Sequence, residues 1–228
     1  FFRGLAKTLL NLMTSAMQTF TIAFLAALIA TVLVQAWLAR RHIAHILAHK
    51  GTVPPDFADR ISLESHQKAA DYSVAKSRLS LFHIALDAAV LLAFTLGGGL
   101  NALDAAWTDA LDNDIPRGAA LIISVIFISS IMEIPLGLYR TFVIDERFGF
   151  NKMTIGVFVA DLFKSALVML ALGLPLVLGV LWLMGAMGEY WWLHAWLAWT
   201  GFNVLVLALY PTFIAPLFNK FAPLEEGE

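Results

Sequence analysis

The chain lacks cysteine altogether and has few charged residues. None of its 228 residues is Cys, and Asp, Glu, Lys and Arg together make up 14%. The absence of thiols excludes disulfide bonds, thiolate zinc sites and a cysteine nucleophile, and it leaves the redox compartment undecided. A soluble domain usually carries about 25% charged residues. With 60% hydrophobic residues, this composition is that of a polytopic membrane protein.

Several functional motifs are also missing. The net charge is −2 and the basic residues form no stripe, so we expect no nucleic-acid partner. The sequence contains no phosphate-binding loop, dinucleotide motif or nucleophilic triad, and no H-E-x-x-H zinc protease motif. These residues therefore contain no complete catalytic site, and we expect them to bind no zinc or other cofactor by themselves.

Long apolar runs are present instead. A spanning helix needs about 20 mostly apolar residues. Five runs meet that length, at residues 16–38, 79–100, 118–138, 154–187 and 191–210. We predict an all-α bundle of five transmembrane helices. Residues 97–99, all glycine, mark the end of the second span, and Pro175 predicts a tilt or kink in the fourth.

The first long loop, 40–78, has its own helical pattern. Ser62 is a candidate N-cap, and apolar residues then recur at near-helical spacing up to the second span. The pattern predicts an amphipathic helix that runs straight into that span. The loop also carries seven of the 15 Lys and Arg residues: Arg40, Arg41, Lys50, Arg60, Lys68, Lys76 and Arg78.

The charges predict the orientation. Loop 101–117 is mainly acidic, whereas loops 40–78 and 139–152 are basic, so the positive-inside rule places the two basic loops in the cytoplasm. The N-terminus then lies outside and the C-terminal end in the cytoplasm. The chain starts at Phe1 and ends in the polar run 225–228. We expect a piece of a longer protein: a membrane domain at 1–212, and the start of a cytoplasmic domain at 213–228.

Four charged residues fall within the predicted spans or at their ends: Asp87, Glu133, Asp161 and Lys164. A charge in the bilayer costs a few kcal/mol, so such groups pair or line a watered cavity. They indicate either a polar chamber or ion path, or structural pairs near the interface. Asp161 and Lys164, three residues apart on one helix, are able to pair. A small transporter or channel using these residues stays open, although no inverted repeat is visible.

Three histidines, His42, His45 and His49, share one face of a helix. Imidazoles on successive turns of a straight helix rarely converge on one metal ion, and no zinc protease motif includes them. We therefore interpret them as headgroup-zone residues.

The segment 139–154 places a charged cluster between two apolar spans, which makes it a candidate functional surface. The alternative is an amphipathic connector that lies on the membrane, with Phe142, Val143, Phe148 and Phe150 dipping into lipid.

Three segments resemble one known family: LYRTFVIDERFGFNKMT at 138–154, YPTFIAPLFNKFAPLEEGE at 210–228 and, more weakly, SHQKAADYSVAK at 65–76. They are similar to the integral-membrane zinc CAAX proteases, the a-factor-converting and prelamin-processing enzymes and their bacterial relatives. The chain looks most like bacterial members, which implies the bacterial inner membrane. The resemblance covers essentially the whole chain and corresponds to the family's N-terminal five-helix region.

The resemblance implies a large chamber walled by membrane helices, and a zinc site held by H-E-x-x-H and a later Glu in a downstream protease domain. It implies as partners the lipid bilayer, that downstream domain, and a peptide or prenylated-protein substrate cleaved near its C-terminus. A non-catalytic membrane scaffold is the remaining alternative. The matching residues are Tyr139, Arg140, Glu146, Arg147, Asn151, Lys152, Pro211, Pro216 and Asn219.

Three expectations attach to these motif residues. Glu146 and Arg147 are expected to form ion pairs with the downstream domain. Asn151 is expected to cap the fourth span, and Pro211 with Pro216 to break the fifth span.

Overall fold

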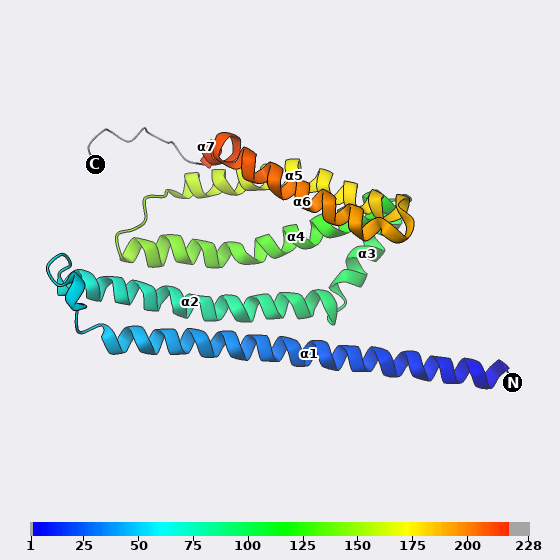
Figure 1. Ribbon diagram of the computed structural model, residues 1–228, viewed down its shortest axis with the longest axis horizontal. Coiled ribbons are helices and arrows are strands. Elements are labelled where there is room, and N and C mark those ends of the chain that lie inside the picture. The colour runs from blue at the N-terminus through cyan, green and yellow to red at the C-terminus, as the bar shows by residue number, and fades with distance from the viewer. Residues whose placement is uncertain (1, 219–228) are drawn as a thin grey trace. The chain divides into compact units, whose positions relative to one another are not determined.

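The structure, a computed structural model, describes residues 2–218 and the side chains from residue 17 onward. Within these residues the regular structure is entirely helical (Figure 1). Five helical stretches are long and apolar enough to cross a membrane: Met17–His49, Leu63–Thr95, Asp114–Asp145, Ile155–Ala186 and Gly188–Phe218. The predicted all-α class with five spans is confirmed.

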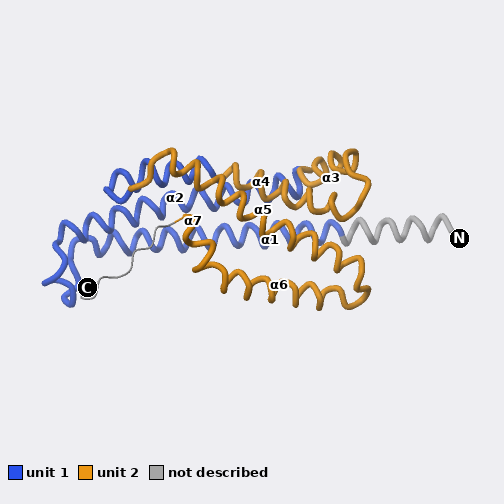
Figure 2. Tube along the Cα trace, turned by 90° about the horizontal axis from the view of Figure 1, so that it is seen from above, with its two compact units in different colours: residues 1–97, 133–151 blue, residues 98–132, 152–228 orange. Residues whose placement is uncertain are grey.

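The chain forms two compact units (Figure 2). Unit 1 consists of residues 1–97 and 133–151, and unit 2 of residues 98–132 and 152–228. Helix α4, Asp114–Tyr139, supplies residues to both.

Unit 1 is built on an antiparallel pair of long helices, α1 (Phe2–His49) and α2 (Leu63–Thr95), which lie side by side in both views. The Ser62 side chain caps α2 by accepting a hydrogen bond from the backbone N–H of Ser65 at 3.2 Å, so the predicted cap and the helix that continues into the second span are confirmed. A short 3₁₀ turn, η1 (Pro55–Phe57), lies in the connection. Lys50 and Asp71 then form an ion pair at 2.6 Å that ties this connection to α2.

Helix α1 does not end where the first span was predicted to end. The chain remains helical through Arg40 and Arg41 to His49, within the segment predicted as a loop. Charged residues mark where a helix leaves the hydrocarbon, but they do not terminate it. The first glycine or proline after the span is Gly51, and the helix ends just before it.

Unit 2 begins at Gly98, whose φ of 80° lies in the left-handed region that glycine adopts without strain. The next helix, α3 (Gly99–Ala110), replaces most of the acidic loop that was predicted at 101–117. Its apolar residues Leu100, Leu103 and Trp107 recur at helical spacing, a signal partly hidden by the acidic composition of the predicted loop. The Trp107 indole N–H donates to Ser124 Oγ on α4 at 3.0 Å.

The rest of unit 2 contains α5 (Ile155–Ala186) and α6 (Trp191–Leu209), which pack against each other, with the short 3₁₀ helix η3 (Gly188–Tyr190) between them. Helix α5 matches the predicted fourth span and contains Pro175. Gly118 on α4 allows close packing, because a Cβ there would lie only 3.2 Å from Leu181.

The fifth span continues past its prolines instead of breaking. After α6 the helix widens into the π-helix η4 (Tyr210–Ile214) and proceeds into α7 (Ala215–Phe218). Pro211 has no N–H to donate, and the wider turn accommodates it, with the N–H of Ala215 bonded to the Tyr210 carbonyl. Pro216 sits in the first turn of α7, where a missing N–H costs little. The predicted break is therefore wrong, and Asn219 lies outside the described residues.

Candidate functional site

The motif segment 139–154 begins as a continuation of α4. Residues Arg140–Asp145 form the π-helix η2 directly after Tyr139, so the first part of the predicted loop is helical. The chain then reverses at Gly149, where φ is +75°. The carbonyl of Asp145 accepts hydrogen bonds from the backbone N–H groups of Phe150, at 2.8 Å, and Asn151, at 3.2 Å. Short π-helical turns inside longer α-helices are often found at functional sites.

Helix α2 holds this segment through four residues that we name the connector clamp: Tyr72, Asp145, Phe148 and Phe150. The Tyr72 hydroxyl donates to Asp145 Oδ1 at 2.8 Å. The Tyr72 ring lies 5.5 Å from the Phe148 ring and 4.8 Å from the Phe150 ring, both centroid to centroid. These distances are typical of favourable aromatic pairs.

The clamp corrects one detail of the alternative in which the segment is an amphipathic connector on the membrane. Ile144 and Phe148 are only 5% and 8% exposed within the structure. Phe148 packs onto α2, so its expected insertion into lipid is wrong. The Tyr72 ring contacts Phe148, and the Tyr72 hydroxyl donates to Asp145 of the same segment. Val143 and Phe150 remain about half exposed.

Asn151 does not cap the fourth span. Its side-chain amide donates to Glu146 Oε2 at 2.9 Å. The N-cap of α5 is Thr154, whose hydroxyl accepts from the Val157 N–H at 3.3 Å. Thr154 directly precedes the first helical residue, which is the position that capping requires. The ion pairs expected of Glu146 and Arg147 with a downstream domain stay predictions, and the Lys152 side chain is exposed.

An open cavity of about 470 Å³ lies between α2 and the motif segment. Its walls are mostly apolar, with Leu79, Phe82 and Val143 among them, and Arg78 and Arg147 contribute two guanidinium groups. Tyr139 lines it as well. A second cavity of about 280 Å³ is lined by Arg140, Lys76, Ser80 and His83. Both combine apolar walls with arginine or lysine side chains, which bind carboxylates.

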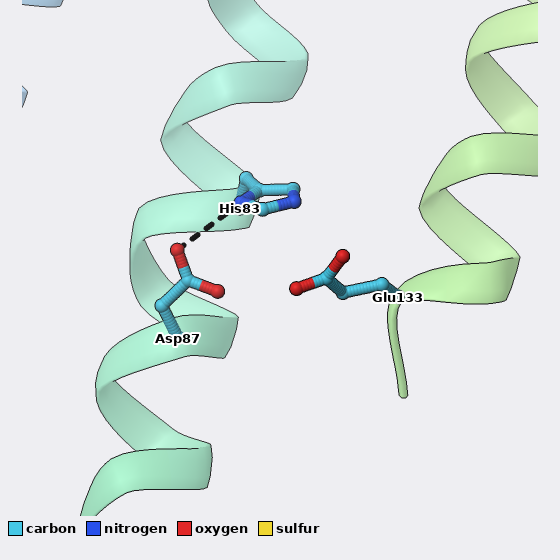
Figure 3. Close-up of side chains that lie close together, drawn as sticks. All are labelled: His83, Asp87 and Glu133. Atoms are coloured by element: carbon cyan, nitrogen blue, oxygen red, sulfur yellow. Dashed lines mark hydrogen bonds and ion pairs between the residues drawn. The ribbon is translucent and has the colours of Figure 1, made fainter. Parts of the chain in front are cut away.

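Two of the predicted intramembrane residues meet on facing helices. Asp87 on α2 and Glu133 on α4 point toward each other, and His83 lies one turn before Asp87 (Figure 3). One ligand atom from each residue lies within 4.8 Å of those of the other two, and His83 Nδ1 is 3.1 Å from Asp87 Oδ2. We name these three residues the polar triad. It is the only group of three such potential metal ligands in the described part of the chain.

The polar triad extends the sequence prediction, which identified Asp87 and Glu133 but left their partners open. The spacing of His83 and Asp87 places both on one helix face, and that signal was visible in the sequence. The approach of Glu133 depends on where α4 lies relative to α2, which no local pattern specifies.

The other candidate residues are paired more simply. Lys164 and Asp161 of unit 2 form an ion pair at 3.2 Å along α5, as their spacing predicts. His45 and His49 stack with ring centroids 4.3 Å apart, and His49 Nδ1 bonds to the His45 carbonyl at 2.9 Å. We name His45 and His49 the histidine ladder, and these two residues contact each other along α1.

Known proteins resemble this chain over most of its length. Residues 42–220 match the family described as CAAX prenyl protease N-terminal, five membrane helices. The Caenorhabditis elegans protein named CAAX prenyl protease 1 homolog is 36% identical over 183 residues, which cover 79% of this chain and 40% of that protein. The human protein of the same name is 29% identical over 189 residues, covering 77% and 38%.

A solved structure agrees with these matches. The crystal structure of S. mikatae Ste24p has a TM-score of 0.75 at 28% identity, covering 88% of this chain and 48% of that one. The chain thus spans less than half the length of these relatives. With its five long apolar helices, it belongs to the CAAX prenyl protease N-terminal family.

Proposed function

We propose that this chain forms the membrane-embedded chamber wall of a zinc metalloendopeptidase that cleaves C-terminal CAAX-type prenylated peptides, or other membrane-associated peptides. The observation that carries the proposal is the family match over residues 42–220. The relatives' name, CAAX prenyl protease 1 homolog, supplies the substrate class.

These residues contain no motif that would hold the catalytic zinc of such an enzyme. The sequence contains no H-E-x-x-H, and the polar triad has a different donor set, one His and two carboxylates. We therefore derive no hydrolytic step through zinc here. In the proposal, these residues shape the chamber, orient the substrate and contact the protease domain.

The polar surfaces of unit 1 support a watered chamber. The side chains of His83 and Asp87 are 44% and 56% exposed, although both lie in a span predicted from apolar content. Charged groups at that depth are stable where water reaches them or a partner neutralises them. The basic cavity with Lys76 and Arg140 suits the carboxylate at the end of a peptide chain.

The orientation and compartment are part of the proposal. The distribution of Lys and Arg favours cytoplasmic placement of loop 40–78 and segment 139–152. This would put a downstream domain on the side where prenylated proteins are made. The bacterial inner membrane stays a prediction from the resemblance.

The test uses the full protein that the gene encodes, purified in lipid nanodiscs. We expect it to cleave a farnesylated CAAX peptide, and a chelator to stop the cleavage. The matched control is the same peptide without the farnesyl group, which separates lipid recognition from peptide cleavage. If the protein does not cleave the peptide but carries ions or solutes across liposome membranes, the protease hypothesis is rejected in favour of the transporter hypothesis.

A further inference from the structure

We propose that the polar triad is a binding site for a first-row divalent cation such as Zn²⁺, contrary to the expectation from the sequence that these residues bind no metal by themselves. Three side chains from two helices, His83 and Asp87 on α2 and Glu133 on α4, direct a nitrogen and two carboxylates toward a common point (Figure 3). The inference uses only contacts within unit 1 and does not rest on the proposed function.

The distances suit a small metal ion. Ligand atoms about 2.1 Å from a tetrahedral zinc ion lie about 3.4 Å from one another. His83 Nδ1 and Asp87 Oδ2 are already 3.1 Å apart. All three ligand atoms lie within 4.8 Å, so a rotamer adjustment of the exposed Glu133 side chain is enough to complete the set.

The two helices place the triad at similar depths. Asp87 lies about 13 Å along α2 from Arg78, and Glu133 about 10 Å along α4 from Arg140, at 1.5 Å per residue. Arg78 and Arg140 flank the predicted spans on the same, cytoplasmic side. The triad therefore sits well inside a hydrocarbon core that is about 30 Å thick.

Charge at that depth requires compensation. Two carboxylates that face each other repel when both are ionised, and the repulsion grows in a low dielectric. Among the described ion pairs, none joins Lys or Arg to Asp87 or Glu133. A divalent cation would neutralise both carboxylates and would also bind the His83 nitrogen, which lies 3.1 Å from Asp87 Oδ2.

The donor set favours a particular class of ion. One imidazole and two carboxylates suit Zn²⁺ and other first-row divalent ions, whereas Mg²⁺ prefers oxygen ligands alone. Three protein ligands leave a position for water, and the partial exposure of His83 and Asp87 provides a route of entry. Bound there, the ion would link α2 to α4.

The test measures metal content in the full protein that the gene encodes, purified in nanodiscs, loaded with Zn²⁺ and dialysed. His83→Ala, Asp87→Asn and Glu133→Gln are each compared with the unsubstituted protein by elemental analysis and by the visible spectrum after Co²⁺ loading. We expect each variant to lose one metal equivalent, or to bind it at least about tenfold more weakly.

Two control variants sharpen the result. Asp161→Asn removes a carboxylate that is paired with Lys164 on α5, and His45→Ala removes an imidazole from the histidine ladder on α1. Both should retain the full metal content. Equal content in all forms, or a loss in His45→Ala instead of the triad variants, would overturn the proposal. If Glu133→Gln fails to accumulate, His83→Ala and Asp87→Asn decide, since both positions are partly exposed.

The outcome is separable from that of the proposed function. Cleavage of the farnesylated peptide with unchanged metal content in the triad variants would reject the cation site and keep the protease. Loss of one equivalent in the variants, with no cleavage by any form, would keep the cation site and reject the protease.

Discussion

Replacing Tyr72 with Phe tests whether the connector clamp holds the motif segment to α2. The substitution removes only the hydroxyl that donates to Asp145 Oδ1 at 2.8 Å and leaves the ring that contacts Phe148 and Phe150. A hydrogen bond to a charged group contributes about 1.5 to 3 kcal/mol. Both partners are only partly buried, so we expect the lower end, about 1.5 kcal/mol.

A loss of about 1.5 kcal/mol in the free energy of unfolding lowers the melting temperature of a domain of this size by about 3 to 6 °C. The assay is thermal unfolding of the full protein in detergent, followed by tryptophan fluorescence. Tyr190→Phe is the matched control, because Tyr190 is 65% exposed and its hydroxyl makes no hydrogen bond in the described part of the chain. It should leave the melting temperature unchanged.

A double-mutant cycle isolates the pair. Asp145→Asn weakens the same hydrogen bond, so the double variant should be more stable than the sum of the two single effects predicts, by about 1 kcal/mol. Strict additivity, or an unchanged melting temperature in Tyr72→Phe, would refute the clamp as a stabilising contact.

Three further substitutions follow from the same geometry and use the same unfolding assay. Phe148→Ala should cost about 3 kcal/mol, because the buried ring leaves a cavity beside Tyr72; a loss below that of Tyr72→Phe would contradict this. Gly149→Ala should cost about 1 kcal/mol, since φ is +75° there, whereas Gly179→Ala, with open space around its Cβ, should cost nothing. Thr154→Ala should cost about 1 kcal/mol and Thr154→Ser much less; equal losses would exclude the cap.

The sequence predicted the spans well because their signal is local. The run 154–187 corresponds to α5 (Ile155–Ala186), and apolar content over a window of that length needs no knowledge of the partner helices. The segments outside the hydrocarbon were harder. Residues 40–49 and 101–110 are helical although they are charged, since polarity excludes lipid but does not exclude a helix.

Contacts between segments that are far apart in the chain could not be predicted from the sequence. Tyr72 and Asp145 are 73 positions apart, and neither residue alone indicates the other. The structure nevertheless connects the two resembling segments 65–76 and 138–154, which were recognised separately. Likewise, Asp87 and Glu133 were identified from their polarity, but only the packing of α4 near α2 makes them a triad with His83.

The motif segment has two faces with different tasks. Ile144 and Phe148 are buried within unit 1, and their role is to fix the segment on α2. Tyr139 and Val143 are about half exposed and, with Arg147, line the open cavity. A π-turn shifts the register of side chains after it relative to an α-helix, so η2 allows Asp145 to reach Tyr72 while Arg147 still faces the cavity. The buried face therefore accounts for stability, and the exposed face is the surface that the proposed function assigns to contacts outside unit 1.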